Sequence, residues 1–115
     1  MVARMSRPFR NVIAILLVVL PAASQAADSA RLRSHGAALL QRHCSRCHAI
    51  GATGDSPLQQ APPMRTIYAR FAPKELQAEL REGMVSRHRE MPQVDFSDED
   101  TDAILAYLYA LTVRK

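Results

Sequence analysis

The 115-residue sequence contains no Trp, three Tyr, three Phe and two Cys. Two cysteines exclude a disulfide-dense scaffold, and so few large aromatic side chains leave little to fill a core. Alternating apolar and polar residues, which would indicate β-strands, are absent. Acidic residues are outnumbered, 11 Asp and Glu against 15 Lys and Arg, which gives a formal net charge of +4. A chain this short allows one domain or part of one, and excludes a multidomain enzyme.

The N-terminal residues differ from the remainder of the sequence. Arg4, Arg7 and Arg10 are the only charged residues among the first 27, and an uninterrupted apolar run covers residues 12–20. Small residues predominate from there to residue 27. A basic start, a short apolar middle and a small-residue exit predict a secretory signal peptide.

Small residues at Ser24 and Ala26 occupy the two positions that a signal peptidase inspects, which predicts cleavage after Ala26. We therefore expect a cleaved signal peptide over residues 1–26, one domain over residues 27–115, and a periplasmic location. The alternative is a transmembrane anchor, but the apolar run is shorter than the about 20 residues that a span needs. We expect no stable membrane insertion of the mature chain.

Most of the net positive charge of the sequence lies in the predicted signal peptide. Without its three arginines, 12 Lys and Arg face the same 11 Asp and Glu, so the net charge falls to +1. The remaining basic residues are scattered singly among acids and form no dense basic run. We therefore expect no nucleic-acid partner.

The mature chain has the spacing and the boundary residues of short helices. Pro73 suits the first position of a helix and Gly83 suits the position after its end, while Ser97 suits an N-cap. The helices are predicted over residues 29–43, after Asp28 or Ser29 as the cap, and over residues 64–71, 73–82 and 98–113. Two Gly and three Pro predict a loop over residues 49–63, and a second loop runs to Phe96. The predicted fold class is all-α, and so small a domain needs a staple or a cofactor to be stable.

The sequence Cys44-Ser45-Arg46-Cys47-His48 has the spacing C-x-x-C-H, which is the attachment signature of c-type haem. Two thiols three residues apart can form thioethers with the two vinyl groups of one haem. The adjacent His48 would then lie under the iron as its proximal ligand. The sequence therefore predicts one covalently attached haem c.

Three other interpretations of the cysteine pair remain. A thiol–disulfide redox pair usually lies in a βαβ context, for which the sequence shows no strands. Half of a zinc site would need a second pair of ligands with metal-binding spacing, which is missing. A plain structural disulfide between the two cysteines would close a very short loop and would therefore contribute little stability.

The mature chain resembles the class I cytochromes c along nearly its whole length. Gly36 stands eight residues before Cys44, where the family has the glycine at which its N- and C-terminal helices cross closely. Leu40 stands four residues before Cys44, where the family has an apolar residue that packs close by. Tyr107 is similar to the aromatic residue that the family places against the glycine. The resemblance implies three to five short helices around one covalent haem, with the two terminal helices crossing.

The resemblance also implies ligands and neighbours for the haem. Pro62 matches the proline whose carbonyl accepts a hydrogen bond from the proximal histidine, with Pro63 as the alternative, and Met64 matches the apolar residue that packs on the haem. Met91, followed by Pro92, matches the methionine whose sulfur binds the sixth iron position. Other candidates for that position are Met64, Met84, His35, His43 and His88.

Further residues are expected around the haem. The walls are expected to include Leu32, Leu39, Leu40, Met64, Ile67, Phe71, Leu76, Leu80, Ile104 and Leu108. Hydrogen bonds to the haem propionates are expected from residues among Arg65, Tyr68 and Arg70.

The resemblance implies an electron-transfer protein rather than an enzyme, with His/Met ligation closing both axial positions of the iron. Its partners would be redox proteins that donate or accept single electrons. One alternative is a haem c subunit of a larger periplasmic oxidoreductase. Another is a peroxidase-like or gas-binding cytochrome with a labile sixth ligand.

Overall fold

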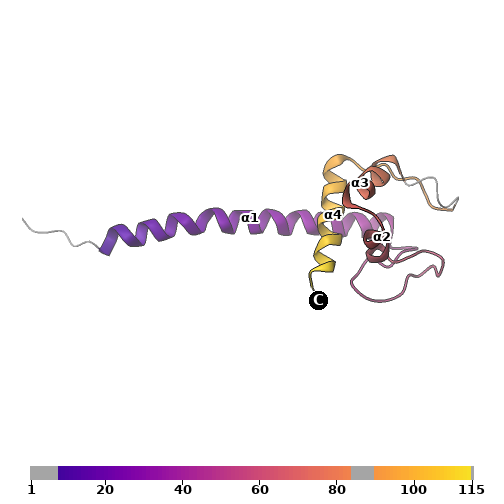
Figure 1. Cartoon of the computed structure of the whole chain (residues 1–115), viewed down its shortest axis with the longest axis horizontal. Helices are drawn as coiled ribbons and strands as arrows, with labels where there is room; N and C mark the ends of the chain where they lie inside the picture. Colours follow the sequence, from indigo (N-terminus) through magenta and orange to yellow (C-terminus); the bar gives the residue numbers. More distant parts are fainter. Residues whose placement is uncertain (1–7, 84–89, 115) are drawn as a thin grey trace, which may run out of the picture. The chain divides into compact units, whose positions relative to one another are not determined.

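A computed structural model describes residues 8–83 and 90–114 of the chain (Figure 1). Within these residues it has four α-helices and no strand, so the predicted all-α class is confirmed. The helices are α1 (Pro8–His43), α2 (Met64–Arg70), α3 (Pro73–Glu82) and α4 (Asp98–Thr112). The chain divides into two units, residues 1–30 and 31–115. Among the described residues, no helix combines the length and apolar character that a membrane span requires.

The start of α1 differs from the prediction, which began this helix at residue 29 behind a cap at Asp28 or Ser29. Helix α1 begins at Pro8, and both of those residues lie inside it. The intervening sequence contains no Gly and includes five Ala and three Leu, which favour a helix, but also three Val and Pro21, which do not, so helix propensity alone does not explain the continuation.

The other helix boundaries agree with the sequence within one or two residues. Helix α3 begins at Pro73, and Gly83 follows its end in the left-handed conformation, with a φ of 86°. The Gly83 N–H donates to the Glu79 carbonyl, which satisfies one of the last helical acceptors. At the start of α4, the Asp100 N–H donates to the Ser97 hydroxyl oxygen over 3.1 Å. Prolines, glycines and caps therefore locate these ends because they act locally.

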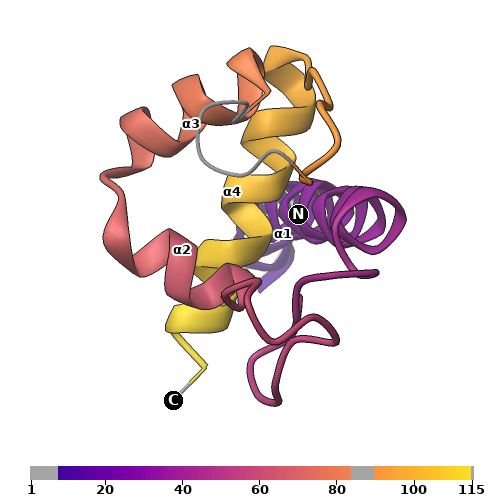
Figure 2. The same cartoon turned by 90° about the vertical axis from the view of Figure 1, so that its right-hand side faces the viewer.

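The core of the unit formed by residues 31–115 lies where α4 packs against α2 and α3 (Figure 2). It consists of Leu39, Leu40, Cys44, Met64, Ile67, Leu76, Leu80, Phe96, Ala103, Ile104 and Leu108. Five of these residues have no exposed surface, namely Leu40, Leu76, Ala103, Ile104 and Leu108. Burial of apolar surface from every helix therefore holds this unit together.

Helix α1 meets α4 at Gly36, as predicted. A Cβ on Gly36 would overlap the Ala103 carbonyl oxygen and lie 2.9 Å from the Ile104 nitrogen, so only glycine permits this approach. The three nearest atoms belong to these two residues, and the expected contact of Tyr107 with Gly36 stays a prediction. Tyr107 lies one turn further along α4, and its hydroxyl donates to the Ile50 carbonyl over 2.9 Å.

Candidate functional site

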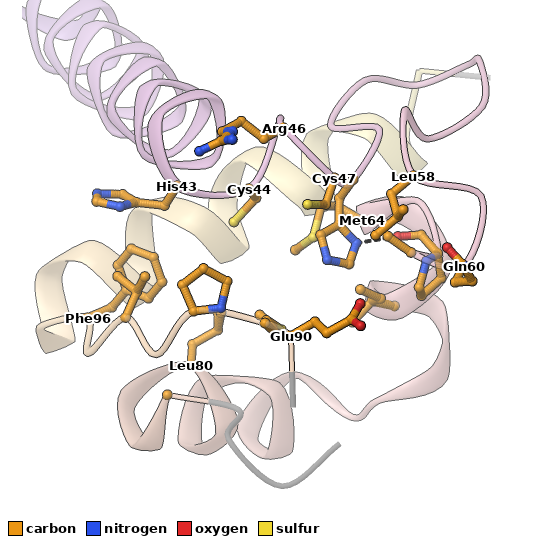
Figure 3. Close-up of a pocket in the computed structure, with 18 of the residues that line it drawn as sticks. His43, Cys44, Arg46, Cys47, Leu58, Gln60, Met64, Leu80, Glu90 and Phe96 are labelled. Atoms are coloured by element: carbon orange, nitrogen blue, oxygen red, sulfur yellow. Dashed lines mark hydrogen bonds between the residues drawn. The ribbon is translucent and has the colours of Figure 1, made fainter. Parts of the chain in front are cut away.

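A cavity of about 630 Å³ opens between the end of α1, residues 58–62, helices α2 and α3, and residues 90–96 (Figure 3). This volume lies within the range of ordinary ligand sites. The lining includes all six residues that the sequence predicted for the site, Cys44, Cys47, His48, Pro62, Met64 and Met91. The fold thus brings together residues that lie up to 47 positions apart in the sequence.

The cysteine–histidine motif lies on a turn that follows the last residue of α1. The Cys44 N–H still donates to the Leu40 carbonyl over 2.8 Å, as in a helix. The Cys44 carbonyl then accepts from Cys47 N–H over 3.1 Å and from His48 N–H over 2.9 Å. The tight turn therefore keeps both thiols and the imidazole at one cavity wall.

Neither thiol is part of a disulfide. Burial, and then the neighbouring Cys47, raise the pKa of the Cys44 thiol to about 11. Redox-active cysteine pairs show the opposite shift, because a lowered pKa supplies the reactive thiolate. The electrostatics of Cys44 thus argue against a thiol–disulfide redox pair.

The His48 imidazole is 8% exposed, and its Nδ1 donates to the Pro62 carbonyl over 2.6 Å, drawn as the dashed line in Figure 3. A carbonyl can only accept, so Nδ1 carries a proton, which leaves Nε2 as the ring nitrogen that can supply a lone pair to a metal. A second-sphere bond of this kind fixes the tautomer and orientation of a metal-binding imidazole. The hydrogen bond predicted for Pro62 is present. The Pro63 carbonyl instead accepts from Thr66 and Ile67 at the start of α2.

Residues 49–63, here called the His48 loop, are fastened by hydrogen bonds near both ends. The Ala49 N–H donates to the Ser56 hydroxyl oxygen over 2.9 Å, and the Ala49 carbonyl accepts from Met64 N–H over 2.8 Å. The Leu58 N–H donates to the Cys47 carbonyl over 3.2 Å. The loop that carries Pro62 is therefore tied directly to the motif that carries His48.

The guanidinium of Arg65 also donates hydrogen bonds to the His48 loop. Its two terminal nitrogens donate to the carbonyls of Gly51, over 3.3 Å, and Gly54, over 2.7 Å. Of the three donors expected for haem propionates, only Arg70 lines the cavity. The expectation for Arg65 is corrected, because its donors are directed to the loop.

Residues 90–96, here called the Met91 segment, form the opposite part of the lining. Met91 is half-buried, Phe96 is buried in the core, and Val94 packs against that core. The closest contact to a Cβ built on Gly83 would be the Gln93 side chain at 2.8 Å, so this segment passes close to the end of α3.

The other candidates for the sixth ligand have different surroundings. Met84 and His88 lie outside the described residues. His35 is engaged by Asp100, with 2.8 Å between Nε2 and a carboxylate oxygen. His43 lines the cavity but is exposed, and its ring meets the Phe96 ring edge-on at 5.6 Å between centroids. Met64 is 3% exposed in the core.

The expected wall residues divide into three groups. Four of them, Met64, Ile67, Phe71 and Leu80, line the cavity. Five more lie in the core without lining it, namely Leu39, Leu40, Leu76, Ile104 and Leu108. The expectation for Leu32 is wrong, because it is 37% exposed. Lining residues that the sequence did not indicate are Arg46, Leu58, Gln60, Ala61, Gly83, Glu90, Pro92, Val94 and Phe96.

Only Phe96 among the missed residues had a usable sequence signal. It directly precedes the Ser97 cap of α4, where an apolar residue commonly packs back onto the helix. Leu58 and Ala61 lie in an irregular loop, where no periodicity reveals which side chains point inward.

A protein-family model described as "Cytochrome C oxidase, cbb3-type, subunit III" matches residues 32–108, two thirds of the chain. No curated protein and no solved structure matches. The family match confirms the resemblance to mono-haem class I c-type cytochromes and implies a covalently bound haem c with its iron.

The cavity has the chemistry that haem c requires. It offers two thiols outside any disulfide, an imidazole whose Nδ1 is fixed by Pro62, and a largely apolar wall. The two arginines of its lining, Arg46 and Arg70, are exposed cations suited to carboxylate groups at the rim. The residues present therefore fit the prosthetic group that the family match implies.

Proposed function

We propose that this chain, which belongs to the cbb3-type cytochrome c oxidase subunit III family, carries single electrons in the periplasm on one haem c with His48 and Met91 as axial ligands. The observation that carries the proposal is the hydrogen bond from His48 to Pro62, in a cavity that Met91 and both thiols also line. Each functional group needed for attachment and for axial ligation lines this one cavity.

In the proposed site, Cys44 and Cys47 would hold the haem through thioethers, and Nε2 of His48 would bind the iron. The Met91 sulfur would take the sixth position, and Met64 would pack on the macrocycle. When bound, haem c supplies a one-electron couple, whose potential a His/Met ligand pair raises.

The chain's own residues would position the group and shield it. The Pro62 carbonyl holds the proton on His48 Nδ1 and keeps Nε2 available. The buried side chains of Met64, Ile67 and Leu80 form a wall of low polarity. Such walls keep water from the site and strengthen the electrostatic interactions inside it.

The periplasmic location rests on the predicted signal peptide. The residues of α1 from 22 to 30 are all exposed, so cleavage after Ala26 would remove no buried side chain among residues 22–26. We infer that removal of residues 1–26 leaves the core around the cavity intact, because every residue of that core lies beyond residue 38.

The family match favours one second candidate, a haem c subunit that relays electrons within a larger oxidase complex. The local chemistry is the same in both cases, since each needs one haem and redox partners. Purification separates them: a soluble carrier elutes alone at its own mass, whereas a subunit copurifies stoichiometrically with an oxidase.

The ligand assignment is tested by carbon monoxide binding to the reduced, haem-loaded protein. Met91→Ala should open the sixth position, so that carbon monoxide binds at neutral pH and shifts the absorption spectrum. Met84→Ala is the matched control and should behave like the wild type. The reverse result, or ready binding by the wild type, would contradict the assignment and favour a gas-binding or peroxidase-like cytochrome.

A further inference from the structure

Arg65 connects helix α2 to the first half of the His48 loop. It is the second residue of α2, three positions after Pro62, and its side chain is half-buried. Its guanidinium donates to the carbonyls of Gly51 and Gly54 over 3.3 and 2.7 Å. Because the guanidinium group of arginine is a cation, these hydrogen bonds are charge-assisted.

The remaining hydrogen bonds of the loop are made by residues outside 51–55. The Ala49 N–H donates to the Ser56 hydroxyl oxygen, the Leu58 N–H donates to the Cys47 carbonyl, and the Tyr107 hydroxyl donates to the Ile50 carbonyl. Within the described part of the chain, residues 51–55 receive their hydrogen bonds from Arg65 alone. Gly54 has a φ of 90°, which glycine adopts without strain, so the turn itself is permitted and Arg65 supplies its hydrogen bonds.

We propose that Arg65 is a positioning residue for His48, because it holds the loop in the arrangement that keeps the Pro62 carbonyl on His48 Nδ1. The inference rests on the proposed function, in which His48 binds the haem iron. A metal-bound imidazole becomes a stronger ligand when its Nδ1 proton is hydrogen-bonded. Arg65 thereby acts on the iron through the loop, without contact with the cavity.

The planar fork of arginine is what this role requires. It reaches two carbonyls at once, whereas a lysine carries a compact charge that cannot reproduce the paired geometry. Arg81 provides a matched control, because its guanidinium also makes a charge-assisted hydrogen bond, to the Asp98 carboxylate over 2.8 Å. Arg81 is exposed and does not line the cavity.

The test uses the haem-loaded protein and its Arg65→Gln, Arg65→Lys and Arg81→Gln variants. The measurement is hydrogen–deuterium exchange of the His48 Nδ1 proton, followed by NMR in the reduced state. Arg65→Gln should speed this exchange about tenfold or more, because loss of the charged donor loosens the loop. The exchange rate of Arg65→Lys should lie between those of the wild type and Arg65→Gln, and Arg81→Gln should exchange at the wild-type rate.

The reduction potential supplies a second readout. Arg65→Lys keeps the positive charge, so a rise in its potential would report the weaker hydrogen bond to His48 rather than a lost cation. Should Arg65→Gln fail to fold, Arg65→Lys alone decides both readouts.

Unchanged exchange in the Arg65 variants, or equal acceleration in Arg81→Gln, would overturn the inference while the proposed function stands. A wild-type protein without a haem-shifted His48 proton would contradict the proposed function itself and remove the basis of the inference. The two failures are therefore distinguishable in the same spectra.

Discussion

The His48 loop and the Met91 segment both border the cavity, but they are held in different ways. The loop is tied by hydrogen bonds to the cysteine motif, to the guanidinium of Arg65 and to the hydroxyl of Tyr107. The Met91 segment has, among its described residues, a single hydrogen bond, from the Gln93 amide to the Asp95 carboxylate over 3.3 Å. Packing of Val94 and Phe96 against the core holds the rest of it.

The difference assigns different roles to the two regions. Hydrogen bonds are directional and fix the orientation of a ring such as the His48 imidazole. Apolar packing is not directional, so it holds a thioether in place while leaving it easier to displace. We therefore expect the His48 side to be required for haem retention and the Met91 side to be the exchangeable one.

The largest effect should come from removing both thiols. Cys44→Ser combined with Cys47→Ser should abolish covalent haem attachment, because no thioether can form. A haem stain after denaturing electrophoresis measures this directly. Met91→Ala should keep the stain at wild-type intensity. If Met91→Ala lost the haem stain to the same extent, the predicted difference between the two regions would be contradicted.

The next largest effect should come from the helix crossing that supports both regions. Gly36→Ala places a Cβ on the Ala103 carbonyl, so the helices must separate. The free energy of unfolding should fall by about 2–3 kcal/mol, as for other overpacked cores. Denaturant titration measures it. In the control, Gly51→Ala, the nearest atom to the new Cβ is 3.9 Å away, and a comparable loss there would contradict the steric explanation.

A smaller effect should separate the two regions in stability. Ser56→Ala removes the acceptor of the Ala49 N–H and should cost about 1 kcal/mol, because that donor is part-buried. Gln93→Ala removes a hydrogen bond between exposed side chains and should change the stability by less than about 0.5 kcal/mol. Thermal unfolding of the two variants side by side checks the order. The reverse order would show that the Met91 segment is the more tightly fastened one.

The smallest effect should appear in acid, at the crossing of α1 and α4. The hydrogen bond from His35 is the main cause that lowers the pKa of Asp100 below its usual 3.8. A carboxyl with a lowered folded-state pKa stabilises the fold above its unfolded-state pKa. This contribution is lost as the pH falls below 3.8 toward the folded-state value.

The measurement is the unfolding free energy of Asp100→Asn relative to wild type. It should be lower at neutral pH, by no more than about 1 kcal/mol for so exposed a pair, and should converge with wild type in strong acid. Asp98→Asn is the control, because the Arg81–Asp98 pair is more exposed, with 76% of the Asp98 side chain accessible. A difference that grows in acid would have the wrong sign.

Local signals account for the parts that the sequence predicted. Pro73, Gly83 and Ser97 mark helix boundaries because their backbone preferences act within one turn. The cysteine–histidine motif is contiguous, so its chemistry is readable without a fold. Gly36 was predicted through the resemblance to the class I cytochromes c, which have a glycine at the helix crossing eight residues before the first cysteine.

Tertiary arrangement explains what the sequence could not predict. Arg65 and Arg70 are the same residue type on the same helix. Only the path of the His48 loop decides that Arg65 donates to the loop carbonyls while Arg70 lines the cavity. The irregular backbone around Leu58 has no period from which an inward-facing side can be inferred. The early start of α1 could not be predicted either, because Pro21 and the β-branched residues before Asp28 argue locally against a helix.

The central claim is that one haem c has both axial positions filled, by His48 and by Met91. The absorption spectrum of the oxidised protein tests it most directly, because a methionine–iron bond gives a weak band at about 700 nm. We predict that the wild type shows this band and that Met91→Ala lacks it. A wild-type spectrum without the band would contradict the account.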